Sequence, residues 1–437
     1  MPDYSSRTSA HIDISESTET AAALLDPDAP FRILILGDFT GRAQRGEKLP
    51  IAGRRVIKVD CDNFEEVIQQ LDVRLDVPRA SLRFRELDHF HPDHIYRTAP
   101  VFEELENFRP ARAPKAPPAN LLESMIGESE SRPVRAEDAG DLAAFIERVS
   151  AKHLADRPDA AQLEWKAKVK SVSCELMKQI LHHAPFQALE SAWRSVLMLI
   201  TRLGAEEGIE LAICDATLDE LTADADATSR WLAGSRKPWS LVVANFAFGQ
   251  SAGDVHRLAI LGNAARAAGA PLLAEAQPPA GEGSAEWQAL RRSAEARWIG
   301  LALPRFLVRL PYGKSTSPLE ALEFEEMPVS EHAHYLWGNP AFCCACLIGL
   351  AFRAYGWDLR PGMVRRLDEM PQHVYDEDGE SVSKPCAEVL LSESTAEQLL
   401  EQGYMPLASV KDQDSVMLVR FCSIASPAAP LSGRWNG

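Results

Sequence analysis

The run Phe31-Arg-Ile-Leu-Ile-Leu36, closed by the pair Gly37-Asp38, predicts a buried strand that leads into a loop. Residues 211–214 and 239–244 are similar apolar runs, and residues 254–268 form a stretch rich in alanine and leucine that predicts a helix. Strand and helix therefore alternate along the chain, which is typical of α/β proteins. We expect a mixed α/β (α+β) core of strands flanked by helices.

Helical periodicity marks several further segments. The apolar residues of 64–71 stand at i, i+3, i+4 and i+7 and predict an amphipathic helix. Residues 161–203 keep helical spacing over a long stretch, which we expect Pro185 to bend because proline removes a helix hydrogen bond. Residues 141–154 and 340–354 predict two more helices.

Proline marks the predicted domain boundary. Residues 109–135 hold five prolines among mixed charges, the composition of an extended linker. Near the start, Ile12 and Ile14 alternate with polar neighbours and predict a short strand that could pair with another chain. We expect two linked modules, with the following organisation: an N-terminal arm (1–30), a first module (31–108), a Pro-rich linker (109–140), a second module (141–430) and a tail (431–437).

Composition excludes several classes of protein. The 437 residues carry 46 Lys+Arg against 63 Asp+Glu, a net charge of −17, so nucleic acid is not an expected partner. The longest apolar runs fall short of the roughly 20 residues needed to cross a bilayer, so no membrane is expected. The first residues lack the basic and apolar regions of a signal peptide, which predicts a cytoplasmic protein. Eight cysteines are too sparse for a disulfide framework and predict reduced thiols.

Two groups of histidines are candidates for chemistry. His89, His91 and His94 lie close together beside two aspartates, and spacing of two residues on an extended segment could chelate zinc. His182 and His183 are adjacent, so on a helix their imidazoles would diverge by about 100° and could not easily share one metal. A structural role explains both groups more simply, and we assign no metal ligand.

Catalysis has little support in the sequence. A Gly-x-Ser-x-Gly elbow is absent, and the loop 41–48 has Glu47 where a phosphate-binding loop needs lysine. We therefore assign no catalytic residue and no cofactor, and we do not expect an enzyme. The alternative to a non-enzymatic protein is a metal-dependent enzyme that uses His89, His91 and His94.

Three strings in the first module carry a family resemblance. They are Phe31-Arg-Ile-Leu-Ile-Leu-Gly-Asp-Phe-Thr-Gly-Arg42, Val59-Asp-Cys-Asp-Asn-Phe64 and Leu82-Arg-Phe-Arg-Glu-Leu-Asp-His-Phe-His-Pro-Asp93. In order and spacing they resemble the small subunit of the contractile sheath of bacterial type VI secretion systems.

The second module resembles the large subunit of the same sheath. The likeness rests on Ile180-Leu-His-His-Ala-Pro-Phe-Gln-Ala-Leu-Glu-Ser-Ala-Trp-Arg194, on residues 294–313 and on Tyr335-Leu-Trp-Gly-Asn-Pro-Ala341. The structural signature implied by both likenesses consists of Asp38, Phe39, His182, His183, Phe186, Gln187, Glu190, Trp193, Arg194, Pro304, Arg305, Pro311, Tyr312, Gly313, Trp337 and Asn339.

The resemblance implies a phage-tail-sheath-like core and a non-enzymatic structural role. The implied partners are other sheath or baseplate subunits and the inner-tube protein. A further implied partner is an AAA+ unfoldase, which recycles sheaths in this family. Sheaths of this family are held together by strand addition between protomers. The resemblance implies that Ile12 and Ile14 belong to a strand-exchange arm.

The chain departs from the family in two ways. Sheath subunits of this kind normally work as two separate chains, whereas here both likenesses lie on one chain. Both parts are also shorter than in the family, and the missing C-terminal piece includes a strand that neighbouring protomers exchange. This departure leaves open an accessory protein that caps, nucleates or regulates a sheath and does not polymerise alone.

Overall fold

The computed structural model describes residues 29–107, 158–204, 208–279, 281, 283–327, 331–377 and 379–436. The predicted arm with Ile12 and Ile14, the linker 109–140 and the helix predicted over 141–154 lie outside the described residues.

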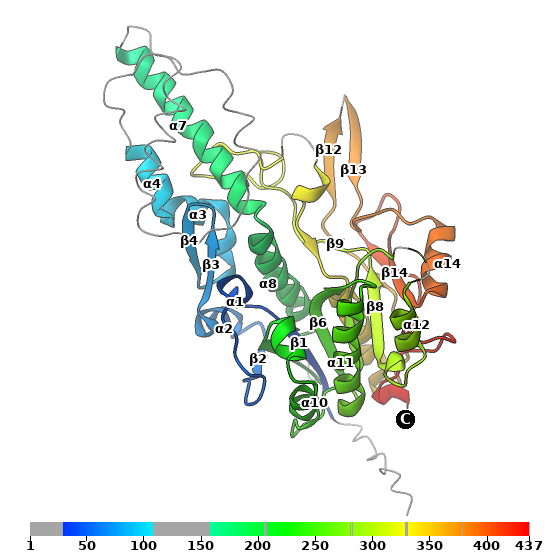
Figure 1. Ribbon diagram of the computed structural model, residues 1–437. Helices are drawn as coiled ribbons and strands as arrows, with labels where there is room; N and C mark the ends of the chain where they lie inside the picture. Colours follow the sequence, from blue (N-terminus) through cyan, green and yellow to red (C-terminus); the bar gives the residue numbers. More distant parts are fainter. Residues whose placement is uncertain are drawn as a thin grey trace, which may run out of the picture.

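A nine-stranded sheet forms the centre of the molecule (Figure 1). Its strands lie in the order β11 (Arg366–Leu367), β15 (Val416–Leu418), β14 (Tyr404–Ser409), β8 (Ile299–Leu303), β7 (Leu272–Ala276), β6 (Leu241–Phe248), β1 (Phe31–Gly37), β5 (Ile209–Asp215) and β2 (Ile57–Val59). The strands from β14 to β5 run parallel, and those at the two ends are antiparallel. The sheet therefore takes strands from both sides of the predicted linker.

Strand β1 lies between β5 and β6, in register with both. Its side chains alternate between two cores: Ile33 and Ile35 pack on one face of the sheet, and Leu34 and Leu36 pack on the other. A strand covered on both faces has no solvent side, which is why its sequence is continuously apolar rather than alternating.

Helices cover both faces of the sheet (Figure 1). Helices α8 (Ala184–Leu203) and α13 (Ala341–Tyr355) contribute to the larger core together with Ile33 and Ile35. Helix α11 (Ala252–Ala268) packs with α10 (Ala225–Ala233) on the opposite face, in the core that holds Leu34. The expected mixed α/β core of strands flanked by helices is confirmed.

The segment before the predicted linker adds a smaller layer beside α8. Its elements are α1 (Arg42–Arg45), α2 (Phe64–Leu71), β3 (Val73–Val77), β4 (Ala80–Phe84), η1 (Leu87–Phe90), α3 (Pro92–Thr98) and α4 (Pro100–Asn107). Strands β3 and β4 form an antiparallel hairpin, and α3 and α4 contact α7 (Pro158–Leu181). The alternating apolar residues of 73–77 carried a strand signal that the sequence reading missed.

The long helical stretch predicted over 161–203 is broken rather than bent. Helix α7 ends at Leu181 and α8 begins at Ala184, with His183 extended at φ −65° and ψ 122°. His183 therefore does not have helical backbone angles, and the helix is interrupted there. Pro185 lies in the first turn of α8, where its missing N–H costs no helix hydrogen bond.

The remaining elements surround the C-terminal half of the sheet. They are α9 (Leu218–Thr222), α12 (Ala285–Arg291), η2 (Glu295–Trp298), β9 (Phe306–Leu307), η3 (His332–His334), β10 (Trp337–Gly338), η4 (Gly356–Asp358), β12 (His373–Glu377), β13 (Glu380–Lys384), α14 (Glu393–Glu401) and η5 (Arg434–Asn436). Strands β12 and β13 form a hairpin that projects from the body (Figure 1).

Candidate functional site

A buried network of charges joins α8 to the segment that follows β9. The Arg309 guanidinium donates to Glu190 Oε1 and to Glu326 Oε2, each over 2.8 Å. Arg194 Nε also donates to Glu190 Oε1 over 2.8 Å, and its Nη2 donates to the hydroxyl of Tyr312 over 3.1 Å. Two arginines thus balance two glutamates, as buried charges require.

Proton equilibria in this network follow from burial and charge. Burial is the largest single effect and would raise the pKa of Glu326, but the charge and hydrogen bond of Arg309, the nearby His182 imidazole and the backbone N–H of Tyr312 together outweigh it and lower that pKa to about 2. Burial raises the pKa of Tyr312 to about 12. Glu326 is therefore ionised and the Tyr312 phenol protonated at neutral pH, so these two groups keep one charge state within the network.

The adjacent histidines have different surroundings. His182 Nε2 lies 3.5 Å from Glu326 Oε1, and the His182 ring stacks on His334 with centroids 3.8 Å apart. His183 is the N-cap residue of α8, and burial lowers the pKa of its imidazole. Each ring therefore has a separate packing environment.

Aromatic contacts tie α8 to the segment 31–107. Trp193 Nε1 donates to the backbone carbonyl of Phe39 over 3.0 Å, and the two rings lie 5.3 Å apart. Phe186 packs edge-on against Phe84 and Phe90, at 6.1 and 5.7 Å. Signature residues on α8 thus contact residues that precede the predicted linker.

A second buried ionic cluster lies at the carboxyl ends of β1 and β5. Glu220 accepts two hydrogen bonds of 3.1 Å from Arg42, pairs with Arg54 at 3.0 Å and accepts from the backbone N–H of Leu49 over 2.6 Å. It also closes a capping box with Thr217 at the start of α9. The sequence reading missed Glu220, although Thr-x-x-Glu is a capping-box signal.

The other signature residues serve local roles. Asp38 accepts from the backbone N–H groups of Arg42 and Ala43 at the start of α1. Arg305 binds Glu388 through two hydrogen bonds of 2.8 and 2.6 Å.

The loops around these residues are tied by backbone contacts. The Trp337 carbonyl accepts from Ser191 Oγ over 2.8 Å, and Asn339 Nδ2 donates to the Ala244 carbonyl over 3.4 Å. Gln187 Nε2 contacts the carbonyl of His334 at 3.5 Å.

Three signature residues lie outside the named helices and strands. Pro304 follows a cis peptide bond, Gly313 bridges to Ser317, and the carbonyl of Pro311 accepts from Thr316. The structure thus brings His182, Glu190, Arg194 and Tyr312 together in the charged network and pairs Trp193 with Phe39, whereas the remaining signature residues have separate local contacts.

The histidines of the first segment have structural partners. His89 Nδ1 accepts from the backbone N–H of Arg85, and its ring stacks on His94 at 3.7 Å. His91 Nδ1 accepts from the N–H of Asp93 at the start of α3. Within the described part of the chain, no group of three or more His, Cys, Asp or Glu side chains is arranged to hold a metal ion.

Comparison with known proteins identifies the class. Residues 165–281 and 280–425 match the family described as EvpB/VC_A0108, tail sheath N-terminal domain. These stretches span more than half of the 437 residues, so the chain belongs to this tail sheath family. Residues 5–114 match a second family, described as type VI secretion system, VipA, VC_A0107 or Hcp2.

A curated relative supports the same assignment. The type VI secretion system sheath protein TssC1 of Pseudomonas aeruginosa is 28% identical in an alignment of 352 positions that covers 70% of this chain and 70% of the relative. The chain is thus a structural component of a type VI secretion contractile sheath, and its family implies contact with other sheath subunits. Among the described residues, no helix combines the length and apolar character needed to span a membrane.

Proposed function

We propose that this one chain does the work of a two-part sheath protomer. Its first part matches one sheath family and its second part matches another. The observation that carries the proposal is the position of β1, which lies between β5 and β6 rather than in a separate sheet. The two parts form one folding unit that a covalent connection keeps in a fixed ratio.

The energetics of β1 support a single unit. Five apolar side chains of β1 are buried between strands and helices of the second part. At about 1.5–3 kcal/mol for each side chain, their burial contributes at most about 15 kcal/mol. The Arg42–Glu220 pair and the Trp193–Phe39 hydrogen bond add polar contacts across the same boundary.

The protomer acts without catalysis, by contact with other subunits in the cytoplasm. The inner-tube protein, baseplate subunits and an AAA+ unfoldase are its further proposed partners. Strand addition by the arm at Ile12 and Ile14 is the proposed link between protomers.

Cleavage within the linker tests the single unit. A specific protease site is inserted in residues 109–140, and the cut protein is passed through a sizing column with and without denaturant. We expect the two fragments to coelute natively and to separate only in denaturant. Fragments that separate without denaturant would show two independent modules and contradict the proposal.

Electron microscopy tests the role in assembly. The protein is imaged alone and after coexpression with the tube protein and sheath subunits of a type VI secretion system. We expect it along the length of sheath tubes. Particles found only at tube ends would favour a cap or nucleator instead, and failure to associate with sheath subunits would contradict the assignment of partners.

A further inference from the structure

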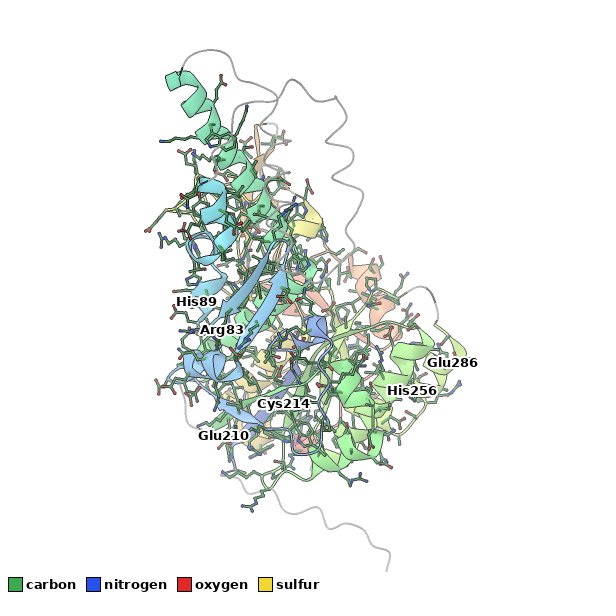
Figure 2. The ribbon with its side chains drawn as sticks, turned by 60° about the vertical axis from the view of Figure 1, so that its left-hand side comes forward. Arg83, His89, Glu210, Cys214, His256 and Glu286 are labelled. Atoms are coloured by element: carbon green, nitrogen blue, oxygen red, sulfur yellow. The ribbon has the colours of Figure 1, made fainter. Side chains whose placement is uncertain are left out.

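A pocket of about 370 Å³ lies beside the outer strand β2, where α10 ends. Its lining includes Arg32 of β1, Lys58 of β2, Glu210 of β5, and the indoles of Trp231 and Trp239. The volume lies within the range of pockets that bind ligands. Figure 2 shows Glu210 at the lower end of the molecule.

Contacts hold the side chains of Arg32, Trp231 and Trp239 that line the pocket. The Arg32 guanidinium lies 4.0 Å over the Trp239 ring and donates to Glu210 Oε2 over 2.9 Å. Trp231 Nε1 donates to the backbone carbonyl of Arg54 over 3.3 Å. These contacts hold the guanidinium and both indoles in place before anything binds.

The rim of the pocket is basic. The side chains of Lys58 and Lys237 are 65% and 69% exposed, and their nearest carboxylates lie at 3.8 and 4.0 Å. Arg55 and Arg236, next to the lining residues Val56 and Ser235, are exposed as well. Positive charge therefore gathers here on a chain whose net charge is −17, so the pocket selects an acidic occupant.

An acidic projection lies at the other end of the same chain. The hairpin of β12 and β13 points away from the body in the upper part of Figure 1, whereas β2 lies in the lower half and α10 near the bottom. Asp376, Glu377 and Glu380 stand at its outer end, and Asp376 and Glu380 are exposed.

The hairpin is poorly stabilised by itself. A two-stranded ribbon is only marginally stable in water. The exposed carboxylates of Asp376 and Glu380 attract a basic surface placed against this end, so the hairpin complements a surface such as the basic pocket.

We propose that the acidic end of the β12–β13 hairpin of one copy docks on the basic pocket of a second copy. This inference rests on the proposed function, since it names one surface through which sheath subunits meet. Because the two surfaces lie at opposite ends of one chain, the contact is heterologous, and repetition builds a ring or an open filament. Attraction between exposed charges makes the contact sensitive to salt.

Reciprocal charge reversal tests the proposal. The pocket variant carries Lys58→Glu and Lys237→Glu, and the hairpin variant carries Glu377→Lys and Glu380→Lys. Asp376 is left intact because it accepts from the backbone N–H of Gly379 in the turn. Arg292→Glu with Lys411→Glu, two exposed positions outside the pocket, is the matched control.

Sedimentation velocity measures self-association of each protein at low and high salt. We expect wild type and control to associate at low salt and each reversed variant to associate at least about tenfold more weakly. An equimolar mixture of the two reversed variants should recover association, because both contacts are then oppositely charged again. Circular dichroism melts check that every variant is folded.

Three outcomes would overturn the proposal: a wild-type chain that stays monomeric at low salt, reversed variants that associate like the control, or a mixture that does not recover. Copurification with sheath subunits is measured in parallel. Variants that lose self-association but still copurify would leave the proposed function standing, so failure of the two proposals can be told apart.

Discussion

The indole N–H of Trp193 donates a hydrogen bond to the backbone carbonyl of Phe39 over 3.0 Å, although 154 residues separate them. Trp193 is fully buried, and its ring also packs edge-on against Phe64. Helix α8 is thereby tied to the loop that follows β1. We expect Trp193→Phe to lower the free energy of unfolding by about 1–3 kcal/mol, because a buried carbonyl loses its donor.

Chemical denaturation measures this change. Trp298→Phe is the matched control, since Trp298 is only partly buried and its replacement should stay within about 0.5 kcal/mol of wild type. Coincident denaturation curves for the two variants would refute a structural role for the Trp193 hydrogen bond.

A second prediction compares the stability of variants at Glu220, which is buried, and at its exposed neighbour Asp219. Glu220 is 5% exposed and binds Arg42 and Arg54, so Glu220→Gln takes the carboxylate partner from Arg54, leaves Arg42 with Asp215 alone, and should cost about 3–5 kcal/mol. Asp219 makes exposed pairs with Arg257 and Lys48, so Asp219→Asn should cost about 0–1 kcal/mol.

Thermal melts compare these two variants, and hydrogen exchange locates the change. Glu220→Gln should speed exchange in residues 42–54, because Glu220 also holds the N–H of Leu49. Equal stability of the two variants would contradict the prediction.

We expect the protein to lose stability in acid as Glu326 becomes protonated. Burial would raise its pKa, but Arg309, His182 and the backbone N–H of Tyr312 together lower it from 4.5 to about 2. The ionised carboxylate therefore contributes roughly 3 kcal/mol above pH 4.5, and this contribution is lost as the pH falls from about 4.5 toward 2.

The comparison of wild type with Glu326→Gln isolates this contribution. The glutamine variant does not titrate, so the difference in free energy of unfolding between the two proteins should shrink on acidification. Urea denaturation at several pH values below 6 measures it. A difference that does not change with pH would be incompatible with the lowered pKa.

For Glu275 we expect the opposite dependence of protein stability on pH. Burial raises its pKa to about 7, against the opposing charge of Arg305. The folded protein then binds more protons than the unfolded chain between pH 4.5 and 7, so stability falls as the pH rises through this window. Glu275→Gln removes the penalty and should stabilise the protein at pH 8 by about 1–3 kcal/mol, with little effect near pH 5.

Melting curves at both pH values test the Glu275 prediction. Glu388→Gln serves as the contrasting variant, because Glu388 pairs with Arg305 and its pKa is lowered; its replacement should destabilise at pH 8. A Glu275→Gln protein less stable than wild type at pH 8 would contradict the assignment.

Local pattern was enough to predict much of the fold. The continuous apolar run of β1 indicated a strand buried on both faces, and the spacing over 64–71 indicated the helix α2. Such signals are readable because side-chain direction repeats at a fixed period within one element. The resemblance likewise selected Glu190, Arg194 and Tyr312, which lie together in the folded chain.

The partners of these residues could not be read in the same way. Arg309 and Glu326 complete the α8 network, and Glu220 holds Arg42 across 178 residues. Neither Arg309 nor Glu326 was singled out, because an isolated charge in a sequence does not indicate whether it is solvated or paired. Only burial in the fold makes pairing obligatory.

The amino-acid sequence by itself determined part of the strands and helices, the α/β class and the sheath resemblance, because these depend on periodicity and on local strings of residues. The tertiary structure alone decided that β1 enters the sheet between β5 and β6, and that the basic pocket and the acidic hairpin lie at opposite ends. Strand order and distance across the molecule arise from contacts between distant residues, which leave no periodic trace along the chain.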